Sequence, residues 1–203
     1  MTDRLPATPE GIAQAAELLR SGVLIAFPTD TVYGLGCRAG DPMALTRLFE
    51  AKRRPPEKLV AMLAASLDQA RKLGYATDER AEALAERWWP GPLTLVLGHA
   101  SDPARPTQGF RVPDHPVALE LIRLSGPLAT SSANRSAEPE ALEADDVLIA
   151  FADTDLVAAV VDGGRVPGGV ASTVVDLSVV PARLRREGPI TREQLAEVIG
   201  PVD

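Results

Sequence analysis

Residues 27–36 read FPTDTVYGLG, and this stretch decides how the rest of the chain is interpreted. An apolar run at residues 23–27 leads into it and predicts a buried strand. Hydroxyl side chains and then two glycines, Gly34 and Gly36, follow that strand. Such an ending often delivers polar groups to a sheet edge where a ligand can approach the backbone. A tight turn without a ligand explains the same residues, so the stretch alone leaves both interpretations open.

The totals of the sequence limit the class of protein. With 203 residues and 45% hydrophobic content, the chain can form one sizeable core, and we expect a single domain over residues 1–203. A net charge of −7 argues against a nucleic-acid binder that uses its whole surface, but it allows a local basic cleft. The single cysteine, Cys37, cannot form an internal disulfide, which favours a reducing, cytoplasmic setting. No apolar run has the length of a membrane helix, and the only histidines, His99 and His115, lack metal-ligand spacing, so we expect no metal site.

The order of the predicted elements indicates an α/β fold with a mixed sheet, because strands and helices alternate without regular βαβ units. The strands are expected at residues 23–27, 59–65, 93–97, 109–112, 128–129, 156–161, 173–177 and 183–186. The helices are expected to begin at Thr8-Pro9, Asp41-Pro42, Ser66, Thr77 or Asp78, Val117, Glu143 and Thr191, where Thr191 and Gln194 form a capping box.

Four polar clusters stand beside apolar strands or helix ends. They are Thr29, Asp30, Thr31 and Tyr33; Lys52 and Arg54; Thr130 to Asn134 (TSSAN); and Ser172-Thr173 with Arg186. Each has an ordinary structural explanation, such as a favourable charge at a helix C-terminus or a turn with local side-chain bonds. Together they supply cations, hydroxyls and an amide, which suit the binding of phosphate and carboxylate. Such a site works by positioning anions and neutralising charge, as in phosphoryl or nucleotidyl transfer. The P-loop and dinucleotide fingerprints are both absent from the sequence.

In combination, the motifs of this chain resemble those of the YrdC/Sua5 family of L-threonylcarbamoyladenylate synthases. The matching pieces are PTDTVYGLG at 28–36, KRRP at 52–55, WPGPLTLVL at 89–97, FRVPDHP at 110–116, TSSANRS at 130–136, ASTVVDL at 171–177 and LRREGPI at 184–190. They follow the family's order and cover the chain from about residue 10 to its end.

The resemblance implies an open, twisted α/β sheet with flanking helices and a large concave, locally positive face. It implies a nucleotidyltransferase that condenses L-threonine, bicarbonate or CO₂ and ATP to threonylcarbamoyl-AMP and releases pyrophosphate, usually with Mg²⁺. A transferase complex downstream then modifies an adenosine of certain tRNAs, and weak tRNA binding by the synthase itself is expected. The chain is similar to the short, single-domain type, without a membrane association.

The resemblance also assigns roles to residues. The family's Lys-Arg-Ser-Asn set, which we take as catalytic and ATP-binding, falls on Lys52, Arg54, Ser132 and Asn134. The residues implied to hold L-threonine are Thr29, Thr31, Arg111, Thr130 and Ser172, with Tyr33 behind the first two. Further contacts to ATP are implied for Thr107 and Arg186, and a loop at residues 163–169 is expected to close over ATP.

Three positions depart from the family's pattern. Leu59-Val60 replaces a Pro-Leu pair, and Glu140-Ala141 replaces a Ser-Pro pair. Ala137 stands where glycine is usual, which restricts the backbone if that position needs a positive φ.

Two other functions remain open at this point. The chain could be an RNA-binding module, although its negative charge and few aromatic residues count against this. It could also be a related carbamoyl-transfer enzyme with another acceptor, which would cleave ATP without a need for threonine.

Overall fold

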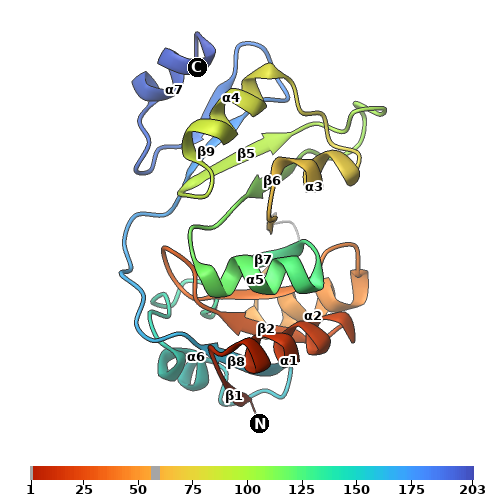
Figure 1. Ribbon diagram of the computed structural model, residues 1–203, viewed down its shortest axis with the longest axis vertical. Coiled ribbons are helices and arrows are strands. Elements are labelled where there is room, and N and C mark those ends of the chain that lie inside the picture. The colour runs from red at the N-terminus through yellow and green to blue at the C-terminus, as the bar shows by residue number, and fades with distance from the viewer. Residues whose placement is uncertain (1, 56–59) are drawn as a thin grey trace. The chain divides into compact units, whose positions relative to one another are not determined.

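The computed structural model describes residues 2–55 and 60–203, and the chain divides into two compact units (Figure 1). Unit 1 comprises residues 1–60 and 115–169, and unit 2 comprises residues 61–114 and 170–203. Each unit is therefore built from two segments of the chain, and each contains five strands and an apolar cluster of its own.

Unit 1 is organised around a mixed sheet. Its strands lie in the order β1 (Asp3–Pro6), β8 (Val157–Asp162), β2 (Leu24–Phe27), β3 (Gly34–Arg38) and β7 (Leu128–Ser132). Strands β1, β8 and β2 run parallel, whereas β3 runs antiparallel to both of its neighbours, β2 and β7. The stretch FPTDTVYGLG therefore connects two central strands of this sheet.

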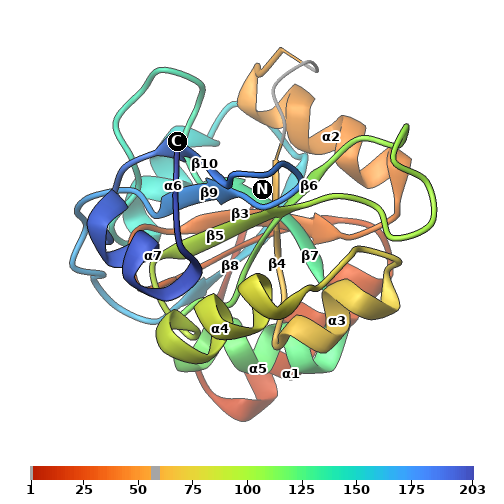
Figure 2. The same cartoon turned by 90° about the horizontal axis from the view of Figure 1, so that it is seen from above.

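Helices cover both faces of the sheet in unit 1. Helices α1 (Pro9–Arg20) and α5 (Pro116–Ser125) pack against each other on one face, and α2 (Pro42–Lys52) and α6 (Ala144–Ala150) lie on the other (Figure 2). Alternate residues of β2, Leu24 and Ala26, join Leu48 of α2 and Val147 of α6 in one apolar cluster. This alternation is what a strand covered on both faces requires.

The first two helices begin where their capping residues predict. Thr8 Oγ1 accepts a hydrogen bond from the backbone of Gly11, and Asp41 Oδ1 accepts from Met43 and Ala44 at 3.0 Å each. Helix α2 ends at Lys52 because Arg53 adopts a left-handed conformation with φ of 49°, and a proline follows at residue 55. Lys52 is thus the last residue of α2, and Arg54 lies just beyond its C-terminal end.

Unit 2 contains five further strands that pair in mixed directions. The order is β4 (Ala61–Leu63), β6 (Gln108–Arg111), β5 (Leu93–Leu97), β9 (Thr173–Asp176) and β10 (Arg183–Arg186). The pairs β4–β6 and β5–β9 are parallel, and the pairs β5–β6 and β9–β10 are antiparallel. Helices α3 (Leu67–Lys72), α4 (Glu79–Trp88) and α7 (Arg192–Ile199) complete the unit, with α4 packed against α7. The capping box of Thr191 and Gln194 opens α7, as predicted.

The α/β class with a mixed sheet is confirmed, but three local predictions need correction. Strand β1 was not predicted, and β3 was not predicted because glycines are unfavourable in strands. Strand β7 extends through Ser132, so the hydroxyls of TSS belong to the strand, whereas the predicted strand ended at Ala129. The departure at Leu59, and the start of the strand predicted there, lie outside the described residues. Among the residues that the structure describes, none of the helices is both long and apolar enough to span a membrane.

Asp176, the last residue of β9 in unit 2, has a buried and hydrogen-bonded carboxylate. Its carboxylate is 2% exposed and accepts hydrogen bonds from Ser178 Oγ at 2.6 Å and from Arg185 Nη2 at 2.6 Å. Burial by itself raises the pKa of Asp176, but the bonds from Ser178 and the charge of Arg185 outweigh it, so the net pKa is lowered. The stabilisation from this carboxylate is therefore present above the ordinary aspartate pKa and is lost as the pH falls through the folded-state value.

We expect Asp176→Asn to lower the free energy of unfolding by about 1–3 kcal/mol at neutral pH, because a buried charged acceptor is lost. The difference from the wild type should shrink as the pH falls below the ordinary aspartate pKa. Urea denaturation at neutral pH and at a pH below the ordinary aspartate pKa measures the difference. Asp68→Asn is the control, since Asp68 is 68% exposed and its ion pair with Arg71 is worth less than about 1 kcal/mol. Equal losses for the two variants would contradict the prediction.

Candidate functional site

A buried lysine, Lys52, is the centre of a polar cluster in unit 1 that also includes Arg54, Ser132 and Asn134. Lys52, the last residue of α2, is 1% exposed. Its Nζ donates hydrogen bonds to the backbone oxygen atoms of Ser132 and Asn134 and to Asn134 Oδ1 at 3.4 Å. An ammonium group has three protons, so each of them has an oxygen acceptor. Lys52 thus fastens the end of α2 to the end of β7.

The segment after β7 forms hydrogen bonds within itself and donates one to the end of α2. Ser132 Oγ donates to Asn134 Oδ1 at 2.5 Å, and Asn134 Nδ2 donates to the Glu138 oxygen at 2.6 Å. The backbone nitrogen of Ser136 donates to the Lys52 oxygen at 3.0 Å. Three residues of the predicted set, Lys52, Ser132 and Asn134, are therefore in direct contact.

Arg54, the fourth member of this set, adds a second positive charge. It follows α2 and is half-buried. Burial and the positive charges of Arg54 and Arg135 together lower the pKa of Lys52 to about 8, against a smaller opposing effect of Glu140. Positive charges that repel one another are stabilised when an anion binds beside them. The cluster is therefore suited to a phosphate or a carboxylate.

Two residues beside this cluster were not predicted from the sequence. Arg135 is 6% exposed and donates to the Ala51 oxygen, and its guanidinium also pairs with Asp153. Arg135 lies inside the TSSANRS motif, but no role was assigned to it from the sequence. Its burial depends on the packing of α2 and α6, which no local pattern indicates.

The hydroxyls predicted to hold threonine lie in the connection between β2 and β3 and on β7. Thr29 is 5% exposed; its Oγ1 donates to the Val32 oxygen at 2.6 Å and lies 3.2 Å from Thr31 Oγ1. Thr130 lies opposite Gly36 in the sheet. A Cβ atom at Gly36 would come within 2.9 Å of the Phe27 ring and 3.3 Å of Thr130 Oγ1, so only glycine fits beside these two side chains.

Tyr33 anchors the start of the loop at residues 163–169. Its buried hydroxyl donates to the Gly164 oxygen at 2.7 Å and accepts from the Gly163 nitrogen at 3.2 Å. Burial raises the pKa of Tyr33 to about 12, so the phenol stays protonated as a donor. The Val166 nitrogen also donates to the Leu142 oxygen at 2.8 Å. The first half of the loop is therefore fastened to unit 1, and its closure over a nucleotide stays a prediction.

The remaining predicted residues belong to unit 2. Ser172 Oγ lies 2.9 Å from Thr94 Oγ1, and Arg186 donates to Ser172 through Nε to the backbone oxygen at 3.0 Å and through Nη2 to Oγ at 3.3 Å. Arg111 on β6 is 8% exposed and donates from Nε to the Gly91 oxygen at 3.0 Å. Thr107 directly precedes β6. Ser172 and Arg186 are thus brought together, and Thr94, which was not predicted, joins them.

The predicted set is divided between the units. Unit 1 holds Thr29, Thr31, Lys52, Arg54, Thr130, Ser132 and Asn134, and unit 2 holds Thr107, Arg111, Ser172 and Arg186. Each unit contributes hydroxyls and at least one arginine, which are groups that bind anions.

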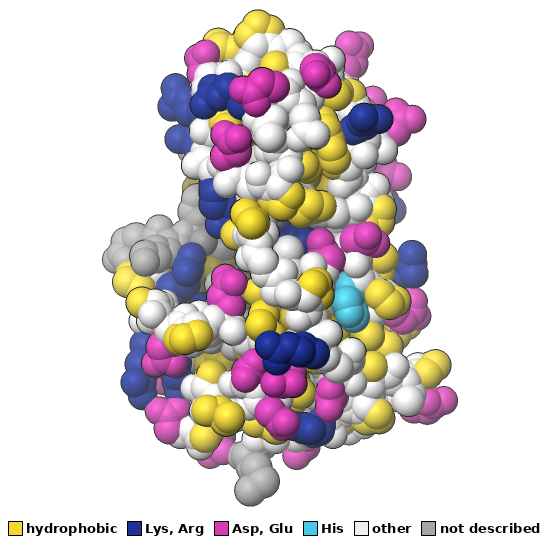
Figure 3. Space-filling model, turned by 90° about the vertical axis from the view of Figure 1, so that its left-hand side faces the viewer, with side chains coloured by type: hydrophobic (Ala, Val, Ile, Leu, Met, Phe, Trp, Pro, Cys, Tyr) yellow, Lys and Arg dark blue, Asp and Glu magenta, His cyan; other side chains and the backbone are white. Residues whose placement is uncertain are grey.

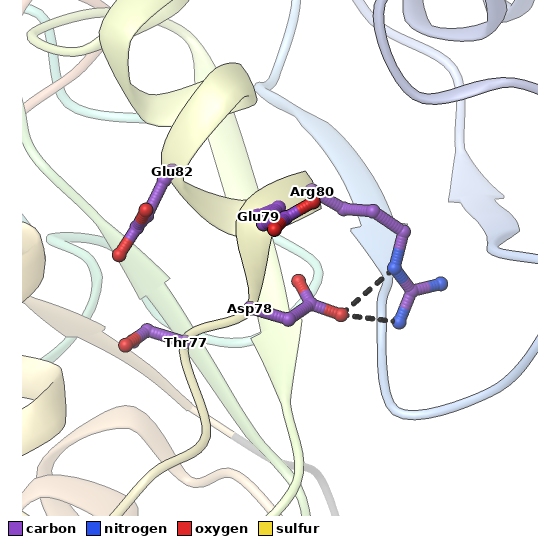
Figure 4. Close-up of a pocket in the computed structure, with 5 residues that line it drawn as sticks. All are labelled: Thr77, Asp78, Glu79, Arg80 and Glu82. Atoms are coloured by element: carbon purple, nitrogen blue, oxygen red, sulfur yellow. Dashed lines mark hydrogen bonds and ion pairs between the residues drawn. The ribbon is translucent and has the colours of Figure 1, made fainter.

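A hollow at the start of α4 is a separate candidate in unit 2 (Figure 4). It is lined by Thr77, Asp78, Glu79, Arg80 and Glu82. Asp78 caps α4 by accepting from the Ala81 nitrogen at 3.0 Å and pairs with Arg80, and Glu82 pairs with Arg71. These bonds explain the side chains structurally, and none of the predicted site residues lines the hollow.

The departure at Ala137 has a visible consequence. Ala137 has a φ of 69°, in the left-handed region that glycine tolerates and alanine does not. The position therefore needs a positive φ, and alanine is strained there.

We expect Ala137→Gly to raise the free energy of unfolding by about 0.5–1 kcal/mol, because relief of the strain exceeds the extra entropy of the unfolded chain. Thermal or urea denaturation measures this. The control is Ala152→Gly, an exposed residue whose φ is not positive, which should lower stability. A loss of stability in Ala137→Gly would contradict the expectation.

The sequence and the structure of this chain are both similar to those of known proteins. The Sua5_yciO_yrdC family model, described as telomere recombination, matches residues 17–188. The threonylcarbamoyl-AMP synthase of Bacillus subtilis is 42% identical over 211 residues, which cover 100% of this chain and 60% of that protein. The one of Chromohalobacter salexigens is 38% identical and covers 84% of this chain and 94% of that protein. The crystal structure of Pyrococcus abyssi Sua5 complexed with L-threonine superposes with a TM-score of 0.89 at 39% identity, over 100% of this chain and 62% of that one.

The chain spans about three fifths of the length of the Bacillus and Pyrococcus relatives. It spans nearly the whole length of the Chromohalobacter relative. The matched region includes both units and all of the predicted site residues.

Proposed function

This chain belongs to the Sua5/YciO/YrdC family, and from that premise we propose that it is an ATP-dependent L-threonylcarbamoyladenylate synthase. The substrates would be L-threonine, bicarbonate or CO₂, and ATP, and the products threonylcarbamoyl-AMP and pyrophosphate. The observation that carries the proposal is the contact of Lys52 with Ser132 and Asn134 beside Arg54, in a chain whose relatives bear this enzyme name. The two units would act together as one domain over residues 1–203.

The chemistry suits these residue types. The threonine amine loses a proton and attacks carbon dioxide, and the resulting carbamate oxygen attacks the α-phosphate of ATP while pyrophosphate leaves. Negative charge builds on phosphate oxygens in this step, and fixed cations and hydrogen-bond donors stabilise it. We assign Lys52, Arg54, Ser132 and Asn134 to catalysis and ATP, Thr107 and Arg186 to further ATP contacts, and Thr29, Thr31, Arg111, Thr130 and Ser172 to threonine.

Mg²⁺ would accompany ATP in this proposal. Within residues 2–55 and 60–203, the structure groups no three His, Cys, Asp or Glu side chains that could hold a metal ion. Mg²⁺ often binds chiefly through substrate phosphates and water, and this is the form in which we include it. The product would pass to a transferase complex that modifies tRNA, as the family resemblance implies.

The alternatives from the sequence have less support. Among the described residues drawn in Figure 3, acidic and basic side chains are interspersed, whereas an RNA-binding surface is typically a continuous basic patch. A carbamoyl transferase with another acceptor would cleave ATP without threonine, and the assay below separates it from the synthase.

The test is pyrophosphate release from ATP, bicarbonate and Mg²⁺, with L-threonine, with L-serine and without an amino acid. We expect release that depends on threonine and exceeds that with serine. In the same assay, Arg54→Ala should lower turnover by about tenfold to a hundredfold, because a charge-assisted contact worth roughly 1.5–3 kcal/mol is lost. Arg38→Ala, an exposed arginine at the end of β3, is the control and should match the wild type. Release that is indifferent to threonine would overturn the proposed function, and normal turnover of Arg54→Ala would overturn the site.

ATP affinity should fall as the pH rises through the pKa of Lys52, about 8, because the free site loses a positive charge. If bound ATP raises that pKa by one unit, affinity drops about tenfold once the pH exceeds both values. The phosphates of ATP are already ionised in this range. Equilibrium binding of ATP without threonine, between about pH 7 and pH 10, measures the change.

Two variants separate Lys52 from other groups. Lys52→Met should bind ATP weakly with little dependence on pH, and Lys72→Met, which alters an exposed lysine of α3, should behave like the wild type. A wild-type affinity that stays constant across the range would refute this role for the Lys52 charge.

A further inference from the structure

Arg135 is the most extensively bonded buried side chain beside the site that has no assigned role. Its side chain is 7% exposed. One Nη donates to the Ala51 oxygen, Nε donates to the Ala150 oxygen at 3.1 Å, and the other Nη pairs with Asp153. The guanidinium carbon lies 5.1 Å from the centre of the Phe151 ring. Each of the three guanidinium nitrogens therefore donates a hydrogen bond, and the Phe151 ring lies against one face of the group.

The two backbone oxygen atoms belong to the C-terminal ends of two helices. Ala51 is the penultimate residue of α2, and Ala150 is the last residue of α6. The last carbonyls of a helix lack partners within the helix and carry partial negative charge, so one arginine satisfies both ends. Asp153 balances the charge and also accepts from Arg53 Nη2 at 2.7 Å.

Arg135 lies at the junction where the segment after β7 meets the end of α2. It follows Asn134 directly, and the oxygen it holds at Ala51 directly precedes Lys52. The other bonds across this junction are those of Lys52 to the end of β7 and of the Ser136 nitrogen to the Lys52 oxygen. Arg135 therefore acts on the same pair of segments that Lys52 joins, through partners other than those of the lysine ammonium.

We propose that Arg135 is a positioning residue: its guanidinium holds the end of α2 against the segment after β7, so that Lys52, Ser132 and Asn134 keep their mutual arrangement. The proposal rests on the proposed function for its effect on turnover. Its effect on the burial of Lys52 does not depend on that function.

The experiment uses the full chain and two readouts. The first is threonine-dependent pyrophosphate release. The second is the acetylation rate of Lys52 by acetic anhydride without substrates, measured by peptide mass spectrometry relative to the exposed Lys72 in the same molecule. The variants are Arg135→Met and Arg135→Lys, and Arg123→Met is the control, since Arg123 is 61% exposed on α5. All are assayed well below their melting temperatures.

In Arg135→Met we expect Lys52 acetylation to rise about tenfold, because the junction opens more often. Turnover should fall about tenfold to a hundredfold, because small displacements of catalytic groups are costly. Arg135→Lys keeps the charge without the planar fork and should fall between the wild type and Arg135→Met in both readouts. Arg123→Met should change neither. If Arg135→Met does not fold, the comparison of Arg135→Lys with the wild type carries the test.

The proposal is overturned if Lys52 acetylation in the folded Arg135 variants stays within about twofold of the wild type, since a structural role elsewhere in the unit would leave Lys52 closed. It is also overturned if their turnover equals that of the wild type. A wild-type protein that releases no pyrophosphate with threonine refutes the proposed function instead, and the acetylation comparison still decides the role of Arg135.

Discussion

The buried charge of Lys52 constrains the rest of unit 1. An ammonium removed from water loses a large hydration energy unless oxygen atoms surround it. Ser132 and Asn134 supply these oxygens, two from the backbone and one from the amide side chain. Backbone oxygens can point at one nitrogen only if the chain turns sharply after β7. The course of the segment at residues 132–138 and the position of the end of α2 therefore follow from a single desolvated charge.

The same charge explains how an acidic protein can attract anions. The net charge of −7 is spread over the chain. Arg54 and Arg135, however, lie close enough to Lys52 for their positive charges to lower its pKa. At short range, and away from bulk water, local cations outweigh the average field of the surface. Burial and the repulsion from the neighbouring arginines hold the pKa of Lys52 at about 8. A phosphate or carboxylate beside the cluster relieves the repulsion between these cations, so the cluster favours anions.

The sequence predicted the elements whose signals are local and missed those that depend on packing. The caps at Thr8 and Asp41 form hydrogen bonds within one turn, so they can be read directly. Strand β3 was missed because Gly34 and Gly36 are poor strand formers, and their use becomes clear only when the Phe27 ring and Thr130 are seen to fill the space. The motifs named Lys52, Ser132 and Asn134, but the three bonds that join them span about eighty positions of the chain. Arg135 was missed for the same reason, since its partners come from α2 and α6.

The strained backbone at Ala137 belongs to this network. Left-handed alanine persists only where neighbouring contacts leave the chain no other path. On one side the Ser136 nitrogen is bound to the Lys52 oxygen, and on the other the Glu138 oxygen is bound to Asn134 Nδ2. Ala137 lies between these two fixed points, so its φ is set by the contacts of Lys52 and Asn134 and not by its own preference. A residue with no polar side chain thus carries part of the free-energy cost of holding the lysine in place, which shows how far the burial of one charge extends along the chain.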